Sequence, residues 1–239
     1  MANPYFQFKQ FTVYHDRCSM KVTTDACLFG AWVAHELHAA SSPKYEILDI
    51  GSGSGLLSLM LAQSINGHIE GIELQDSDYL QSLENVAQSP YAERIQIFKG
   101  DALTFPYAKK YDVVISNPPF YEKDLRSDSS GKNIAHHDDG LKLDALVKLI
   151  QKVLQPSGTF YLLFPAKRIQ EIKREIAISH LCINKMVSVR QTEKHTHFRF
   201  LLKGSFYETP LQQEEIVIKT DNNYTDAFVR LLQPYYLYL

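Results

Sequence analysis

The sequence predicts an α/β protein whose mostly parallel sheet of seven strands has helices on both faces and ends in an antiparallel hairpin. Three observations support this fold class. A short apolar run at 47–50 stops at a glycine loop, and an apolar helical segment follows at 56–63. A second strand at 68–73 is again followed by a helical pattern, at 77–88. Another apolar run, Tyr111–Ser116, ends at a polar motif. Alternating strands and helices are typical of parallel sheets, whose ligands bind at the carboxyl ends of the strands.

The other elements are predicted from periodicity. Apolar and polar residues alternate over 6–13, as in a short hairpin, and a helical pattern begins at Thr24. The segment 35–43 is predicted to be a polar connector. Further strands are expected at 94–98, 158–164, 183–190, 198–203 and 216–219, and further helices at 143–154, 167–178 and 225–232. The strands at 183–190 and 198–203 form the expected antiparallel hairpin.

Composition is that of an ordinary globular protein. Of the 239 residues, 45% are apolar and 22% are charged. No apolar run approaches the roughly 20 residues of a membrane span, and the N-terminus lacks the pattern of a signal peptide. The three widely spaced cysteines suit reduced thiols and form no C-x-x-C metal motif. We therefore expect a cytoplasmic protein.

Charge is distributed unevenly along the chain. The net charge is −2, but residues 120–203 hold 15 Lys and Arg against 9 Asp and Glu, a balance of +6. The remainder carries 10 against 18, a balance of −8. Such a distribution could steer a polyanion to one face, or it could be an ordinary solvated surface.

The glycine loop is the first candidate ligand site. Gly51, Gly53 and Gly55 alternate, and Asp49 lies two residues before the first of them. A dinucleotide fingerprint would need Gly or Ala at position 56, where this chain has Leu. The pattern resembles motif I of the S-adenosylmethionine-dependent methyltransferases, whose ligand carries a cationic amino group that an acid suits. A glycine loop that serves only as a tight turn is the alternative.

Two further acids follow predicted strands. Glu73 lies 24 positions beyond Asp49 at a strand end, where an acid can accept hydrogen bonds from ribose hydroxyls. Asp101 and Ala102 follow the third core strand, and an acid there could accept a hydrogen bond from an adenine amino group. Glu73 could instead simply close its strand, and Asp101 could simply form a turn.

The motif Asn117-Pro118-Pro119-Phe120 directly follows the strand Tyr111–Ser116. The prolines fix the backbone and lack N–H groups, which leaves the surrounding carbonyls available as acceptors. Asn117 adds a side-chain acceptor, and Phe120 adds an aromatic face. This combination suits a planar substrate that bears an NH2 group. We therefore expect all four residues to be catalytic, the alternative being a turn without chemistry.

The segment 122–140 is long and polar for a connection. It contains the cluster His136-His137-Asp138-Asp139, which could bind a metal, but no helical or strand spacing organises these side chains. A solvated loop facing the substrate is the favoured interpretation, and no metal site is predicted.

Four stretches carry a resemblance to a known family: FQFKQFTVYHDRCSMKVTTDACLFGAW, ILDIGSGSGLLSLMLAQ, NPPFY and YTDAFVRLL. NPPF at this position resembles the signature of enzymes that methylate exocyclic amines of adenine or guanine, or the side-chain amide of glutamine. Together the four stretches resemble the bacterial tRNA1(Val) N6-adenine methyltransferase family, which modifies the adenine just 3′ of the anticodon. The resemblance covers nearly the whole chain.

This resemblance implies the class I methyltransferase fold, S-adenosylmethionine as cofactor and N6 of adenine 37 in tRNA1(Val) as methyl acceptor. It implies that Lys21, Thr24, Asp25 and Asn117 help to bind the cofactor. It also implies one domain over 1–239, whose residues 1–42 form an extension at the cofactor site. Neither a membrane nor an obligate protein partner is implied.

The chain departs from the family pattern at one place. It has K-V-T-T-D-A where K-V-G-T-D-G is expected, so Thr23 and Ala26 alter the backbone detail of this segment.

Two rival functions remain. A methyltransferase acting on protein glutamine shares the N-P-P motif but usually has Tyr at the position of Phe120 and differs upstream. An N-methyltransferase acting on another RNA or DNA amine also shares the motif. A non-catalytic cofactor-binding protein would have no use for the four motif residues together.

Overall fold

The structure is a computed structural model that describes residues 3–40, 44–118 and 141–239. The strands are β1 (Tyr5–Gln7), β2 (Thr12–Tyr14), β3 (Tyr45–Ile50), β4 (Gly67–Glu73), β5 (Ile95–Lys99), β6 (Tyr111–Ser116), β7 (Leu154–Pro165), β8 (Cys182–Thr192), β9 (Arg199–Ser205), β10 (Gln212–Thr220) and β11 (Asn223–Tyr224). The helices are α1 (Thr24–Ala40), α2 (Leu56–Ser64), α3 (Asp76–Ala87), α4 (Leu143–Val153), α5 (Ile169–Ile178) and α6 (Asp226–Leu232), and the 3-10 turns are η1 (Ala92–Arg94) and η2 (Ala166–Arg168).

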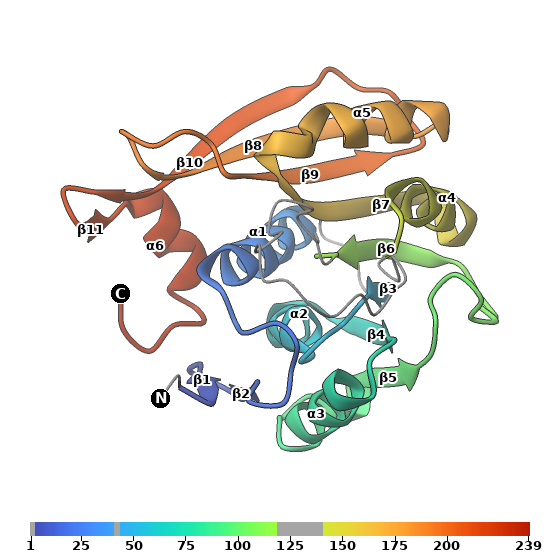
Figure 1. Cartoon of the computed structure of the whole chain (residues 1–239), viewed down its shortest axis with the longest axis horizontal. Helices are drawn as coiled ribbons and strands as arrows, with labels where there is room; N and C mark the ends of the chain where they lie inside the picture. Colours follow the sequence, from blue (N-terminus) through green and yellow to red (C-terminus); the bar gives the residue numbers. More distant parts are fainter. Residues whose placement is uncertain (1–2, 41–43, 119–140) are drawn as a thin grey trace, which may run out of the picture.

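The central sheet has the strand order β11-β10-β8-β9-β7-β6-β3-β4-β5. Strands β3, β4, β5, β6 and β7 pair in parallel, whereas β9 pairs antiparallel to both β7 and β8. Figure 1 shows the sheet running from β10 and β8 at the top of the view, through β7 and β6, to β5 near the bottom. The predicted parallel strands and the antiparallel hairpin are therefore confirmed.

The sheet is wider than the seven predicted strands. Strand β10 pairs in parallel with β8, and β11 pairs antiparallel to β10, so the hairpin is not the edge of the sheet. Only Ile216 and Ile218 of β10 are buried, while 212–215 is exposed. This polar first half explains why the sequence predicts a strand only over 216–219.

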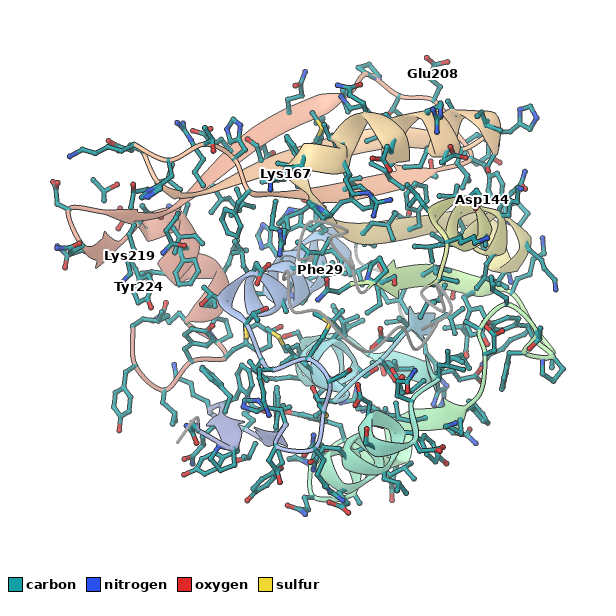
Figure 2. The ribbon with its side chains drawn as sticks, in the orientation of Figure 1. Phe29, Asp144, Lys167, Glu208, Lys219 and Tyr224 are labelled. Carbon is teal, nitrogen blue, oxygen red and sulfur yellow. The ribbon has the colours of Figure 1, made fainter. Side chains whose placement is uncertain are left out.

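Two hydrophobic cores cover the two faces of the sheet. Successive residues of a strand point to opposite faces, so Ile47 of β3 packs with α1, α2 and α6, and Leu48 packs with α4 and α5. Phe29, labelled in Figure 2, lies fully buried in the first core. The predicted arrangement with helices on both faces is confirmed.

The predicted connector at 35–43 was wrong, because α1 continues through most of it. Leu37 is buried against the sheet, and Glu36 forms ion pairs with Lys185 at 2.9 Å and Lys203 at 2.8 Å. Glu36 is therefore a partner of two sheet lysines, although its stretch has the pattern of a polar connector. In the same way β7 begins at Leu154, directly after α4 ends, and not at 158.

The N-terminal residues form the expected hairpin of β1 and β2. The turn between them lies against the C-terminal tail: Phe8 forms a bridge with Tyr236, and the backbone N–H of Lys9 donates to the carbonyl of Tyr235 at 2.8 Å. No helix among the described residues is long and apolar enough to cross a bilayer.

Candidate active site

The loops after β3, β4, β5 and β6 meet at one edge of the sheet, because the carboxyl ends of parallel strands lie together. The glycine loop 51–55 connects β3 to α2. Gly51, Gly53 and Gly55 have φ of 71°, 54° and 80°, in the left-handed region that favours glycine. A Cβ built at Gly51 or Gly53 would meet no described atom within 4 Å. Among the described residues, the loop therefore faces open space on the side of these two glycines.

Glu73 lies beside this loop at the end of β4 and is only 6% exposed. Its Oε2 accepts a hydrogen bond from the Gly53 N–H at 2.8 Å, and its Oε1 accepts one from the Gln75 N–H at 2.7 Å. Burial raises the pKa of Glu73 despite these two donors. A carboxylate has about four acceptor sites, so two remain for further donors such as hydroxyls.

Asp49 lies beneath the loop and is fully buried. Its Oδ2 accepts a hydrogen bond from Ser58 Oγ at 2.8 Å, while Oδ1 has no partner among the described residues. Burial raises the pKa of Asp49 to about 7, and the nearby charge of Glu73 adds to the effect. Asp49 can therefore act on a cationic ligand through its field, since the side chain does not reach the surface of the described part of the chain.

This burial predicts a pH-dependent stability. The carboxyl group titrates at about 3.8 in the unfolded chain and at about 7 in the folded one, so the folded state binds the proton more tightly. The free energy of unfolding of the wild type, measured relative to that of Asp49→Asn, should fall as pH rises from about 4 to about 7 and then level off. Denaturant titrations of both proteins across this range test the prediction. A difference that does not change with pH would contradict it.

The loop after β5 has a clear structural role. The Gly100 N–H donates to the carbonyl of Glu73 at 2.9 Å, and Asp101 Oδ1 accepts from the Leu103 N–H at 2.9 Å. Asp101 is exposed and Ala102 is buried. The turn role is thus present, and binding of an adenine amino group by Asp101 stays a prediction.

The motif after β6 begins at the same edge. Ser116 Oγ donates to the carbonyl of Ile50 at 2.8 Å, which ties the end of β6 to the start of the glycine loop. Asn117 is half-buried and Pro118 is buried. Pro119 and Phe120 lie outside the described residues, as does the His136–Asp139 cluster.

The N-terminal site candidates lie at the start of α1. Lys21 Nζ donates to the carbonyl of His15 at 2.7 Å, and Asp25 forms an ion pair with Arg199 Nε at 2.8 Å. Thr24 is the first residue of α1. Arg199 pairs with Pro165 at the end of β7, so Asp25 too lies near the carboxyl edge. No local sequence pattern predicts this ion pair, because its partners are 174 positions apart.

Thr23, one of the two departures from the family pattern, precedes α1. Its carbonyl accepts the first helical hydrogen bond, from the Cys27 N–H at 3.0 Å, so Thr23 takes the N-cap position. Ala26, the other departure, is buried. Both residues are therefore compatible with a helix that begins here.

Sequence reasoning missed Asp78, Gln81, Ser82 and Asn85, four polar residues buried on one face of α3. Their spacing is that of one helical face, which in isolation indicates a solvated surface. Asn85 donates to the carbonyl of Ser54, so this face reaches the glycine loop.

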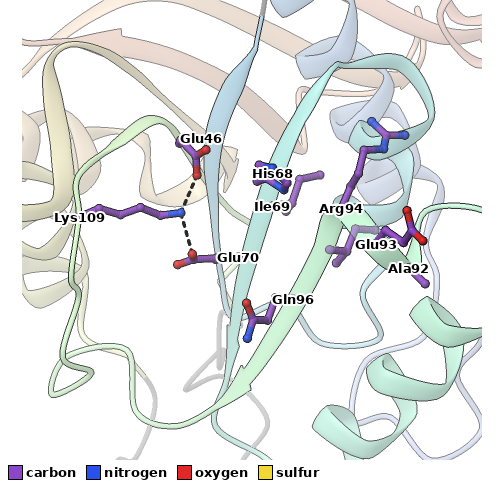
Figure 3. A pocket seen from close by; sticks show the side chains of 10 residues that line it. Glu46, His68, Ile69, Glu70, Ala92, Glu93, Arg94, Gln96 and Lys109 are labelled. Atoms are coloured by element: carbon purple, nitrogen blue, oxygen red, sulfur yellow. Dashed lines mark hydrogen bonds and ion pairs between the residues drawn. The ribbon is translucent and has the colours of Figure 1, made fainter.

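A pocket of about 390 Å³ lies at the opposite, amino edge of the sheet. Figure 3 shows Lys109 between Glu46 and Glu70 there, with ion pairs of 2.5 and 2.7 Å. The lysine forms ion pairs with both acids, and the pocket is separated from the glycine loop by the length of the strands. We therefore assign it no part in the chemistry. No three His, Cys, Asp or Glu side chains in the described ranges are grouped to hold a metal ion.

Comparisons with known proteins agree with this geometry. The family model of the methyltransferase small domain matches residues 32–167. Proteins from Bacteroides thetaiotaomicron and Dyadobacter fermentans, both named tRNA1(Val) (adenine(37)-N6)-methyltransferase, are each 36% identical to this chain. The first alignment covers 100% of both sequences and the second covers 98% of both. A relative of the same name from Parabacteroides distasonis is 40% identical over 75% of each sequence.

Solved structures support the fold. A protein from Agrobacterium tumefaciens described as a predicted O-methyltransferase superposes on this chain with a TM-score of 0.66. The two sequences are 14% identical, and the superposition covers 88% of this chain and 96% of the other. A protein from Listeria monocytogenes described as a class I S-adenosylmethionine-dependent methyltransferase has a TM-score of 0.63 and 13% identity, with coverage of 90% of this chain and 71% of its own. The chain has the class I methyltransferase fold.

Proposed function

The chain belongs to the tRNA1(Val) (adenine(37)-N6)-methyltransferase family, and we propose that it transfers a methyl group from S-adenosylmethionine to N6 of adenine 37 in tRNA1(Val). One observation carries the proposal: the glycine loop, Glu73 and the Asn117-Pro118 motif meet at the carboxyl edge of one class I sheet. This is where such folds bind a nucleoside ligand and its reaction partner.

The residues at this edge fit the cofactor. Within the described part of the chain, open space lies beside Gly51 and Gly53, and Glu73 keeps two acceptor sites next to it for ribose hydroxyls. Asp49 contributes negative potential from beneath the loop, and Lys21 lies in the segment just before α1. The roles of these residues, and of Thr24, Asp25, Asp101 and Ala102, are part of the proposal.

The methyl acceptor is a poor nucleophile, because the lone pair of an adenine N6 is delocalised into the ring. The Asn117 side-chain oxygen and the Pro118 carbonyl accept hydrogen bonds from the two N6 hydrogens and favour a more tetrahedral nitrogen. These bonds strengthen as positive charge develops on N6, so they stabilise the transition state more than the ground state. When bound, the cofactor supplies a methyl group carried by a sulfonium. The sulfonium becomes a neutral thioether when the methyl group is transferred. The methylated N6 is then positively charged and loses one of its two hydrogens as a proton to water, so neither a metal nor a strong base is required.

The adenine must leave the anticodon-loop stack to reach this site. Phe120 is proposed to stack on the exposed base, as aromatic side chains do in single-stranded RNA recognition. In-line placement of N6 and the methyl carbon supplies much of the remaining rate.

Methyl transfer from labelled S-adenosylmethionine to total tRNA that lacks the modification tests the proposal. The labelled nucleoside should be N6-methyladenosine, located at position 37 of tRNA1(Val) by mapping the labelled tRNA. Label recovered in protein glutamine, or in another nucleic-acid amine, would establish the rival activity. Cofactor binding without any transfer would remove the enzymatic assignment.

The tRNA is proposed to lie over the basic side of this edge. Lys167 and Arg168 occupy η2, directly after β7 ends at the carboxyl edge, and Figure 2 labels Lys167. The positive balance of residues 120–203 supports this orientation.

Reversing both charges, in Lys167→Glu with Arg168→Glu, should raise KM for tRNA and flatten its salt dependence while cofactor affinity stays unchanged. The reason is that fewer phosphate contacts release fewer counterions on binding, and the number of released counterions sets the salt dependence. Initial rates over a range of tRNA and salt concentrations give the result. The matched control is Lys110→Glu with Lys152→Glu, which reverses two exposed lysines at the amino edge. Equal effects in both double variants would show that only total charge matters.

A further inference from the structure

Helix α3 buries a polar face against the rest of the protein. Asp78, Gln81, Ser82 and Asn85 are each no more than 3% exposed. Buried polar side chains need hydrogen-bond partners, because an unsatisfied group costs free energy comparable to a lost hydrogen bond. The partners therefore indicate what this face is for.

Most of the partners belong to one segment, residues 14–22, which we name the N-terminal strap. Asp78 accepts hydrogen bonds from the Ser19 N–H at 2.9 Å and from Ser19 Oγ at 2.6 Å. Gln81 Oε1 accepts one from Arg17 Nε at 3.1 Å. The strap is thus attached to α3 mainly through polar contacts.

Asn85 makes the most extensive set of these contacts. Its Oδ1 accepts from the Tyr14 N–H at 2.9 Å, and its Nδ2 donates to the Tyr14 carbonyl at 2.8 Å. The second Nδ2 hydrogen goes to the carbonyl of Ser54, in the glycine loop, at 2.9 Å. One amide side chain, 1% exposed, therefore connects the strap to the glycine loop.

The strap leads directly to the cofactor side. Lys21 Nζ donates to the His15 carbonyl at 2.7 Å, and the Val22 N–H donates to His15 Nδ1 at 3.3 Å, so the strap is closed on itself just before α1. Burial raises the pKa of the Cys18 thiol to about 12, and the nearby charges of Asp78 and Glu73 add to the effect. The strap thus contains Lys21 and passes near Glu73.

We infer that Asn85 is a positioning residue for the cofactor: it holds the N-terminal strap and the glycine loop at a fixed spacing, and so sets cofactor affinity without touching the cofactor. The inference rests on the proposed function in that the cofactor lies at the glycine loop. Gln81 gives a contrast on the same helix face, because it is about as buried and, among the described residues, its side chain bonds only to the strap.

Asn85→Ala should weaken binding of S-adenosylmethionine roughly tenfold or more, the scale of one or two lost buried hydrogen bonds. The single-turnover rate at saturating cofactor should stay close to that of the wild type, which gives a rise in KM without a matching loss of rate. Calorimetric titration and single-turnover kinetics measure the two quantities. Amide hydrogen exchange at Tyr14 and Ser19 should also become faster in the variant.

Asn85→Asp keeps the acceptor for the Tyr14 N–H but cannot donate to Ser54. If Asn85→Ala does not fold, this variant still tests whether Asn85 sets cofactor affinity. It should show the same loss of cofactor affinity. Gln81→Ala is the control and should lower the melting temperature while cofactor affinity stays unchanged. An Asn85→Asp protein that is destabilised but binds the cofactor like the wild type would overturn the inference, as would an equal loss of affinity in Gln81→Ala.

These outcomes are separate from those of the proposed function. Cofactor titration involves no tRNA, so a wild type that binds S-adenosylmethionine without methylating tRNA would refute the proposed substrate and leave the role of Asn85 intact. A wild type that does not bind the cofactor would refute both.

Discussion

Asn117→Ala should fold and bind S-adenosylmethionine but methylate adenine at least about a hundredfold more slowly, the scale on which one preorganised electrostatic partner acts. The side-chain oxygen of Asn117 is the proposed acceptor for an N6 hydrogen, and its hydrogen bond gains strength only as the nitrogen becomes positive. Its loss should therefore lower the rate and leave cofactor affinity unchanged. Melting temperature, cofactor affinity and single-turnover rate should be measured on the same preparation.

Two further variants make this result specific. Asn117→Asp keeps an acceptor oxygen and should be less impaired than Asn117→Ala. Ser116→Ala removes the neighbouring buried hydrogen bond to Ile50, so it should cost stability but little rate per folded molecule. If Asn117 only closes a turn, Asn117→Ala will behave like Ser116→Ala, and the catalytic assignment fails.

Phe120 belongs to the same proposal, although it lies outside the described residues. Phe120→Ala should also lose rate, since stacking is worth roughly 1–3 kcal/mol per base. Phe120→Tyr should be milder, because the ring face is retained.

Glu73→Ala should weaken binding of S-adenosylmethionine by roughly 1.5–3 kcal/mol, or about 10- to 150-fold, since hydrogen bonds that the ribose hydroxyls donate to the charged carboxylate are lost. The Gly53 and Gln75 N–H groups lose their acceptor in the same variant, which loosens the glycine loop and adds to the effect. Calorimetric titration measures the change. Because burial raises the pKa of Glu73 and hydroxyl donors favour the carboxylate, wild-type affinity should also fall on acidification.

Glu70→Ala is the matched control for Glu73→Ala. Glu70 lies at the middle of the same strand, where it bonds to Tyr111 and Lys109. This variant should change the melting temperature without changing cofactor affinity. A Glu73→Ala protein that is only less stable, with wild-type affinity, would reduce Glu73 to an acid that closes its strand.

The sequence by itself determined the fold class and the position of the candidate site. Strand runs such as Tyr111–Ser116, the alternating glycines and the spacing from Asp49 to Glu73 are properties of short segments or of their distance along the chain. Periodicity and backbone chemistry act within such segments, so they can be interpreted without knowing what lies beside them. The carboxyl edge then follows from the topology of a parallel sheet.

Only the tertiary structure decided the contacts around that site. Asp25 with Arg199, Asn85 with Ser54 and the pairing of β10 with β8 join residues far apart in the chain. The polar face of α3 has the pattern of a solvated surface, and its burial is visible only when the strap is in place. Which distant segment packs against a side chain decides its partner, and therefore whether the side chain stabilises or destabilises the fold. No local pattern in this sequence carries that information.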